Sequence, residues 1–158
     1  MSRTSFRDLI RSPDGAIGKS DFRRGALIVF ALSLVLGVLL FGIFEVNHGM
    51  AWMTVAVAPF FGVIFFFSAA SLVYFWYCLF AKRLRSVARG PGLLYGWLAL
   101  LLVAAASRLV AYQNETLKLA TEGWLTWAIY VADICAIAAL LVFATLLVVS
   151  WFGEEKTP

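Results

Sequence analysis

Residues 80–92 read FAKRLRSVARGPG and place four cations, Lys82, Arg83, Arg85 and Arg89, within eight residues. The rest of the chain is very apolar. Of its 158 residues, 63% are hydrophobic and 14% are charged, and the mean hydropathy is +0.90. Soluble domains carry about 25% charged residues. The composition therefore predicts a membrane protein, in which residues 80–92 form a polar break.

Long apolar runs lie before and after this break. A run of about 18 or more apolar residues can cross a hydrocarbon core of ~30 Å as a helix. The sequence contains four such runs, at 25–44, 54–81, 93–112 and 124–152. Short connections favour antiparallel neighbours. We predict an all-α, four-helix antiparallel membrane domain over 25–152, between a basic tail at 1–24 and a short tail at 153–158. Pro59 predicts a kink near the start of the second helix.

The cations are distributed unevenly between the two ends of these runs. The amino-terminal tail, residues 80–92 and the carboxyl tail together hold eleven Lys and Arg residues, whereas the opposite side holds Arg108 and Lys118. Short loops rich in Lys and Arg stay in the cytoplasm. Both termini are therefore predicted to be cytoplasmic.

Two interpretations of the basic residues beside the runs stay open. They act as a topology signal alone, or they also bind anionic lipid headgroups, at about 1 kcal/mol per cation. Nucleic-acid binding is not expected, because the cations lie too close to the bilayer to follow a duplex. The residues concerned are Arg23, Arg24, Lys82, Arg83, Arg85 and Arg89.

The basic tail contains a short amphipathic pattern. In SFRDLIRSP (5–13), Phe6, Leu9 and Ile10 share one helical face, and Pro13 discourages continuation. This pattern predicts a two-turn interfacial helix with its apolar side toward the acyl chains. The alternative is a disordered tail, because so short a helix is marginal alone.

Two motifs resemble a known family. GAIGKSDFRRG (15–25) is similar to the Gly-Arg-x-x-Arg-x-x-Phe/Tyr-Trp stretch of the domain of unknown function 805 family, and KRLRS (82–86) is similar to its Lys-Arg-Leu-His-Asp stretch. Ala16, Lys19 and Arg23 depart from the first motif, and Arg85-Ser86 from the second. The resemblance implies a multi-pass protein of the bacterial inner membrane. It implies no activity and no catalytic residue.

One cation and one acid lie inside the apolar runs, Arg108 in the third and Asp133 in the fourth. An ionisable residue at mid-bilayer costs ~2.5–3.5 kcal/mol, so each requires a partner. At 1.5 Å per residue, Arg108 lies ~23 Å and Asp133 ~26 Å from the cytoplasmic face. These matching depths predict an intramembrane ion pair. It would either hold the helices together or contribute to transport; alternatively, Arg108 could extend to the interface.

Small residues predict where helices contact each other, and aromatic residues predict which parts of the helices lie at the membrane interfaces. Small residues four apart allow helices to approach closely, and tryptophans and tyrosines gather at membrane interfaces. The small-residue spacings are Ala128/Ala132/Ala136, Ser33/Gly37 and Ala58/Gly62, and the aromatic residues are Trp52, Trp124, Trp127, Tyr130 and Trp151.

Signatures of catalysis are sparse. Cys78 and Cys135 do not form a C-x-x-C motif, and His48, with Glu45 and Asn47, is better interpreted as a solvated loop residue than as a metal ligand. We therefore expect no enzyme activity, cofactor or metal. The first functional hypothesis is an accessory protein that packs with lipids, with another membrane protein or with copies of itself. The alternative is a small transporter or ion pathway that uses Arg108, Asp133 and hydroxyls such as Ser68, Ser71 and Ser107.

Overall fold

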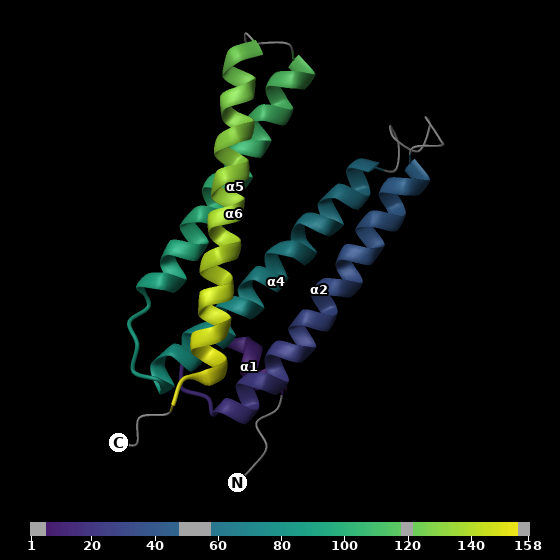
Figure 1. The fold of residues 1–158 in the computed structure, drawn as a ribbon. Helices are drawn as coiled ribbons and strands as arrows, with labels where there is room; N and C mark the ends of the chain where they lie inside the picture. The colour runs from purple at the N-terminus through teal and green to yellow at the C-terminus, as the bar shows by residue number, and fades with distance from the viewer. Residues whose placement is uncertain (1–5, 48–57, 118–121, 155–158) are drawn as a thin grey trace. The chain divides into compact units, whose positions relative to one another are not determined.

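The computed structural model describes residues 6–47, 58–117 and 122–154, and the regular structure in them is α-helical (Figure 1). Four of its helices are long and apolar enough to cross a membrane, as the sequence predicts. The elements are α1 (Phe6–Arg11), α2 (Lys19–Asn47), α4 (Ala58–Ser86), α5 (Gly92–Leu117) and α6 (Glu122–Phe152).

The helices extend beyond the apolar runs from which they are predicted. α2 begins at Lys19, and α4 continues to Ser86, so the basic residues after Ala81 are helical. α4 begins at Ala58, which places Pro59 in the first turn. There the missing N–H has no helical partner to lose, and proline is favoured. At this position proline gives no reason for the predicted kink.

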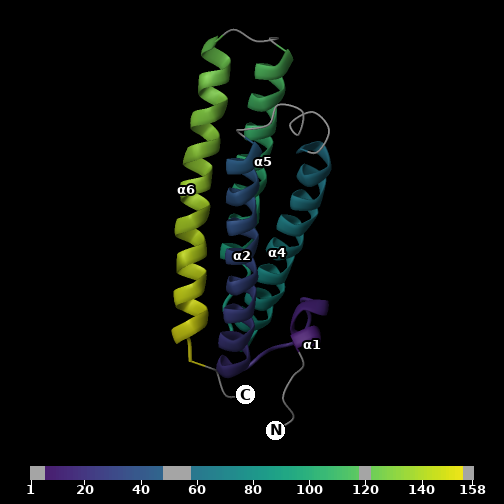
Figure 2. The same cartoon turned by 90° about the vertical axis from the view of Figure 1, so that its right-hand side faces the viewer.

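The chain divides into two units, and the first ends at Ser86. In this unit α2 and α4 form an antiparallel hairpin, and α1 packs against α4 (Figure 2). Phe22, Ala26 and Val29 form the buried stripe of α2. Phe80 on α4 packs against Phe22, with ring centroids 6.0 Å apart, and stacks on Trp76 at 5.4 Å.

α2 and α4 approach each other closely at Gly25. A Cβ at this position would lie 2.7 Å from Cδ2 of Leu79 and 3.5 Å from Cδ1 of Leu9. In contrast, a Cβ at Gly37 or Gly62 would meet nothing within 4 Å. Within this unit, neither Gly37 nor Gly62 therefore makes the predicted close contact with the other helix. Of these three glycines, only Gly25 lies where α2 and α4 are in close contact.

The second unit contains the α5–α6 hairpin. Buried residues recur every seven positions on both helices, and the spacing of about 3.5 residues per turn is typical of helices that coil around each other. The buried positions are Trp97, Ala104 and Ala111 on α5, and Ala132, Ala139 and Leu146 on α6. Ala128 and Ala132 are buried as predicted, but Ala136 is exposed, because the buried stripe continues at Ala139.

Candidate functional site

The basic end of α4 binds the backbone of the amino-terminal tail. Lys82 Nζ donates to the carbonyl of Leu9 at 3.1 Å, Arg83 Nη1 to that of Ile17 at 3.4 Å, and the Tyr74 hydroxyl to that of Arg11 at 3.3 Å. Arg85 Nη1 donates to the carbonyls of Pro13 at 2.6 Å and Gly15 at 3.4 Å. We call these four α4 side chains, with the tail carbonyls they bind, the tail clamp.

The local structure of the tail explains why its carbonyls are available. The last carbonyls of α1 have no partner within the helix. Residues 12–18 are not helical. Ser12 and Asp14 form a local turn, in which Asp14 N donates to Ser12 Oγ at 3.1 Å, and Gly15 has a φ of 88°. Unpaired carbonyls beside a membrane are costly, so long cationic side chains are suitable donors.

The six predicted headgroup-binding residues differ in burial. Lys82 is 5% exposed and Arg83 is 0% exposed. Arg24, Arg85 and Arg89 are exposed, and Arg23 is half-buried. The structure thus brings Lys82, Arg83 and Arg85 together around the tail, whereas Arg24 and Arg89 face outward.

On α1, the side chain of Leu9 faces the protein. Leu9 is 2% exposed and lies near Gly25, whereas the sequence pattern predicts that it faces the acyl chains. The physical reason is the gap opened by Gly25, which a leucine side chain fills. The residue pattern does not single out Gly25. Its position directly after Arg23-Arg24, where the chain enters the apolar run, is only a weak indication of close helix packing.

Truncating Leu9 should release the tail. We expect Leu9→Ala to weaken docking of α1 by about 2 kcal/mol, because it removes buried methyl groups beside Gly25. Trypsin cleavage after the exposed Arg11 should then be at least tenfold faster, because it follows the population of the undocked tail. Ile10→Ala, at a half-buried position, is the matched control and should change the rate much less. Equal rates in both variants would contradict this role of Leu9.

A second polar site lies on the α5–α6 hairpin. Arg108 Nη2 and Asp133 Oδ1 form an ion pair. The two side chains are 57% and 49% exposed, so the pair lies on the flank of the hairpin and not in its alanine-rich centre. Opposite charges at the same level of two antiparallel helices attract each other strongly in a medium of low polarity.

Breaking this pair should destabilise the hairpin. Asp133→Asn leaves Arg108 charged without a counter-ion, at a cost of up to about 3 kcal/mol on membrane-insertion scales. We expect a lower midpoint of thermal unfolding in detergent and a lower yield of folded protein. The charge-reversed double variant, Arg108→Asp with Asp133→Arg, should recover part of the loss. Unchanged midpoints of thermal unfolding in the single and double variants would show that the ion pair does not stabilise the hairpin.

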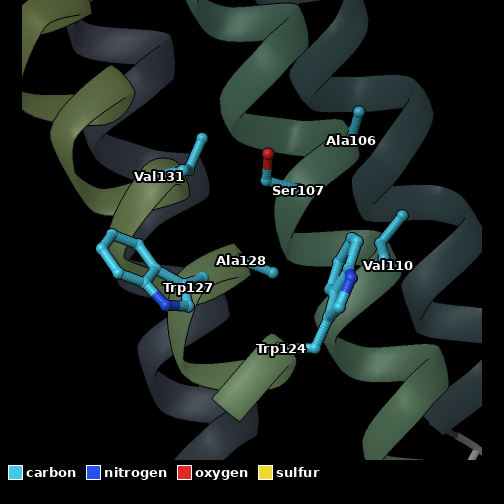
Figure 3. Close-up of a pocket in the computed structure, with 7 residues that line it drawn as sticks. All are labelled: Ala106, Ser107, Val110, Trp124, Trp127, Ala128 and Val131. Atoms are coloured by element: carbon cyan, nitrogen blue, oxygen red, sulfur yellow. The ribbon is translucent and has the colours of Figure 1, made fainter. Parts of the chain in front are cut away.

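An apolar groove of about 440 Å³ opens between α5 and α6 near the start of α6 (Figure 3). The indole rings of Trp124 and Trp127 lie on either side of Ala128, and both rings are exposed. Ser107 supplies a hydroxyl to an otherwise apolar lining. The groove can accept an apolar chain, but it presents no cluster of charged groups.

The hydroxyls proposed for a transport line are divided between the two units of the chain. Ser68 and Ser71 belong to the first unit and donate to the carbonyls of Ile64 and Phe67 on their own helix, each at 2.8 Å. Another groove of that unit, about 320 Å³, contains both serines. Ser107 belongs to the second unit, with Arg108 and Asp133.

The remaining candidates offer little chemistry. Cys78 is buried and Cys135 half-buried, and both are free thiols. Within residues 6–47, 58–117 and 122–154, no three His, Cys, Asp or Glu side chains lie close enough together to hold a metal ion. His48 lies outside the described residues.

Comparisons with known proteins return nothing for this chain. Neither the family models, the curated proteins nor the solved structures that were searched contain a match to it. The resemblance to the domain of unknown function 805 family stays a prediction.

Proposed function

We propose that this chain is a non-enzymatic accessory protein of the bacterial inner membrane that packs with lipids or other membrane proteins. The observation that carries the proposal is the use of its polar side chains. The clamp residues bind the protein's own tail, and Arg108 binds Asp133 across the α5–α6 hairpin. These contacts hold parts of the chain together, which supports a structural rather than a catalytic use of these side chains.

The proposal includes both termini in the cytoplasm. The clamp supports it, because the tail carbonyls and the basic end of α4 are in direct contact and so belong to the same face of the membrane. This face carries the excess of Lys and Arg, which favours the cytoplasm. On this face Arg24, Arg85 and Arg89 would meet anionic headgroups, because they are the exposed members of the basic set.

Cysteine labelling tests the orientation. In a background with Cys78 and Cys135 replaced by alanine, an impermeant maleimide should leave Arg89→Cys and Glu154→Cys unlabelled in intact cells and label both after lysis. Thr116→Cys, near the far end of α5, is the matched control and should react in intact cells. Reaction of Arg89→Cys or Glu154→Cys from outside would overturn the proposed topology.

Reconstitution tests the accessory role against the transport alternative. Liposomes that contain the purified chain should keep an imposed proton or sodium gradient as long as empty liposomes do. In-membrane cross-linking should yield a stoichiometric product with one defined partner or a second copy. A gradient that collapses with the wild-type chain and persists with Asp133→Asn would reject the accessory role and favour transport.

A further inference from the structure

The Arg108–Asp133 pair uses only part of its hydrogen-bonding capacity. A guanidinium carries five N–H donors, and a carboxylate offers two acceptor oxygens. Within the residues that the structure describes, the contact joins Nη2 to Oδ1 alone. Arg108 Nε and Nη1 and Asp133 Oδ2 remain available, on side chains that are 57% and 49% exposed.

The position of the pair along both helices places these free groups near one boundary of the bilayer. Arg108 lies about 24 Å from the start of α5 at Gly92, and Asp133 about 28 Å from the end of α6 at Phe152, at 1.5 Å per residue. The hydrocarbon core is ~30 Å thick. The exposed Trp127 and Tyr130 lie closer to the start of α6 than Asp133 does, as expected of an interfacial belt. A lipid headgroup can therefore reach the pair, whereas bulk water is scarce there.

We infer that the pair is a binding site for a zwitterionic headgroup of the phosphoethanolamine type. The lipid phosphate would accept from the free N–H groups of Arg108, since guanidinium groups bind phosphate through two parallel hydrogen bonds. The primary ammonium would donate to Asp133 Oδ2. This inference rests on the membrane placement in the proposed function and adds a ligand to it.

Charge and donor chemistry select this headgroup over its relatives. Arg108 and Asp133 together are neutral, so an anionic headgroup adds a negative charge that nothing in the pair balances. A choline headgroup carries the same phosphate, but its trimethylated nitrogen has no N–H to donate to Asp133. Among these three, only the phosphoethanolamine group combines a phosphate with a cationic N–H donor for Asp133.

Native mass spectrometry of the full chain tests the inference. The protein is reconstituted in nanodiscs with equal amounts of phosphatidylethanolamine, phosphatidylcholine and phosphatidylglycerol and is then released in mild detergent. We expect one retained phosphatidylethanolamine per chain, at least tenfold above phosphatidylcholine. Equal retention of the three lipids would overturn the site.

Three variants connect the retained lipid to the pair. Asp133→Asn should lower the preference for phosphatidylethanolamine over phosphatidylcholine to about twofold or less, and Arg108→Gln should abolish retention of both. The double variant Arg108→Gln/Asp133→Asn leaves neither charge without a counter-ion, so it separates misfolding from loss of the lipid. The matched control, Arg89→Gln/Glu154→Gln, removes one cation and one acid elsewhere in the same unit and should retain the lipid.

Three outcomes would reject the lipid in different ways. A lipid-free dimer that the double variant dissociates would assign the pair to a second copy of the chain. A chain that fails to insert into nanodiscs at all would reject the membrane placement itself. Normal insertion without selective retention would reject the site and leave the proposed function intact.

Discussion

Replacing Arg83 by alanine is expected to cost the first unit about 4 kcal/mol, because it leaves a cavity and removes a charged donor from buried acceptors. Arg83 is the largest fully buried side chain in the described residues. Its Nη1 donates to the carbonyl of Ile17 and, at 3.0 Å, to the Ser86 hydroxyl. The loss would appear as a lower midpoint of thermal unfolding in detergent and as faster trypsin cleavage after Arg11.

Arg85→Ala is the matched control for this experiment. Arg85 is the same residue type, two positions along the same helix, and it also donates to tail carbonyls. It is exposed, so water or headgroups can replace its contacts, and we expect a loss of no more than about 1 kcal/mol. Arg83→Lys should be intermediate, because an ammonium lacks the planar fork of guanidinium. Equal losses for Arg83→Ala and Arg85→Ala would show that burial does not set the strength of the clamp.

Replacing Gly25 by leucine should have the second-largest effect, a loss of about 3 kcal/mol from overpacking. The first side-chain atom would already lie 2.7 Å from Leu79 Cδ2. Leu79 is fully buried, so it cannot move into open space. The larger side chain must therefore separate α2 from α4 or displace Leu9. The measurement is the free energy of unfolding in mixed micelles.

Gly37→Leu provides the control on the same helix. A side chain at this position meets nothing within 4 Å and lies on an exposed face. Because leucine also favours helix over glycine by up to about 1 kcal/mol, Gly37→Leu should be neutral or stabilising. Combining Gly25→Leu with Leu79→Ala should recover part of the loss, since the two residues share one space. A destabilised Gly37→Leu, or no recovery in the double variant, would disprove the proposed close packing at Gly25.

The tail clamp and the Arg108–Asp133 pair differ in what they hold together. The clamp binds carbonyl groups of the backbone, at Pro13, Gly15 and Ile17. It fixes a short segment that would otherwise be marginal as a helix. The Arg108–Asp133 pair joins two helices that already pack along an alanine-rich stripe, so its free groups can serve another partner.

The sequence by itself determined the all-α class and the four helices of membrane-spanning length. Runs of about twenty apolar residues have few other stable states in lipid, because every backbone polar group must be satisfied within the segment. The sequence also indicated which charges are exceptional. Arg108 and Asp133 are conspicuous because each is a lone ionisable residue in an apolar run, and rise per residue gave their matching depths.

Only the tertiary structure decided what the basic residues of α4 contact. Composition treats Lys82, Arg83 and Arg85 as equivalent cations, yet Arg83 is buried and Arg85 is exposed. Their partners are carbonyls more than sixty positions away in the sequence. Every residue has a backbone carbonyl, so the residue pattern cannot indicate which carbonyls are bound. Likewise, the sequence does not distinguish a glycine at a close helix contact from one on an exposed face. Gly25 differs from Gly37 because Leu79 and Leu9 lie beside it, and that proximity exists only once the helices have packed.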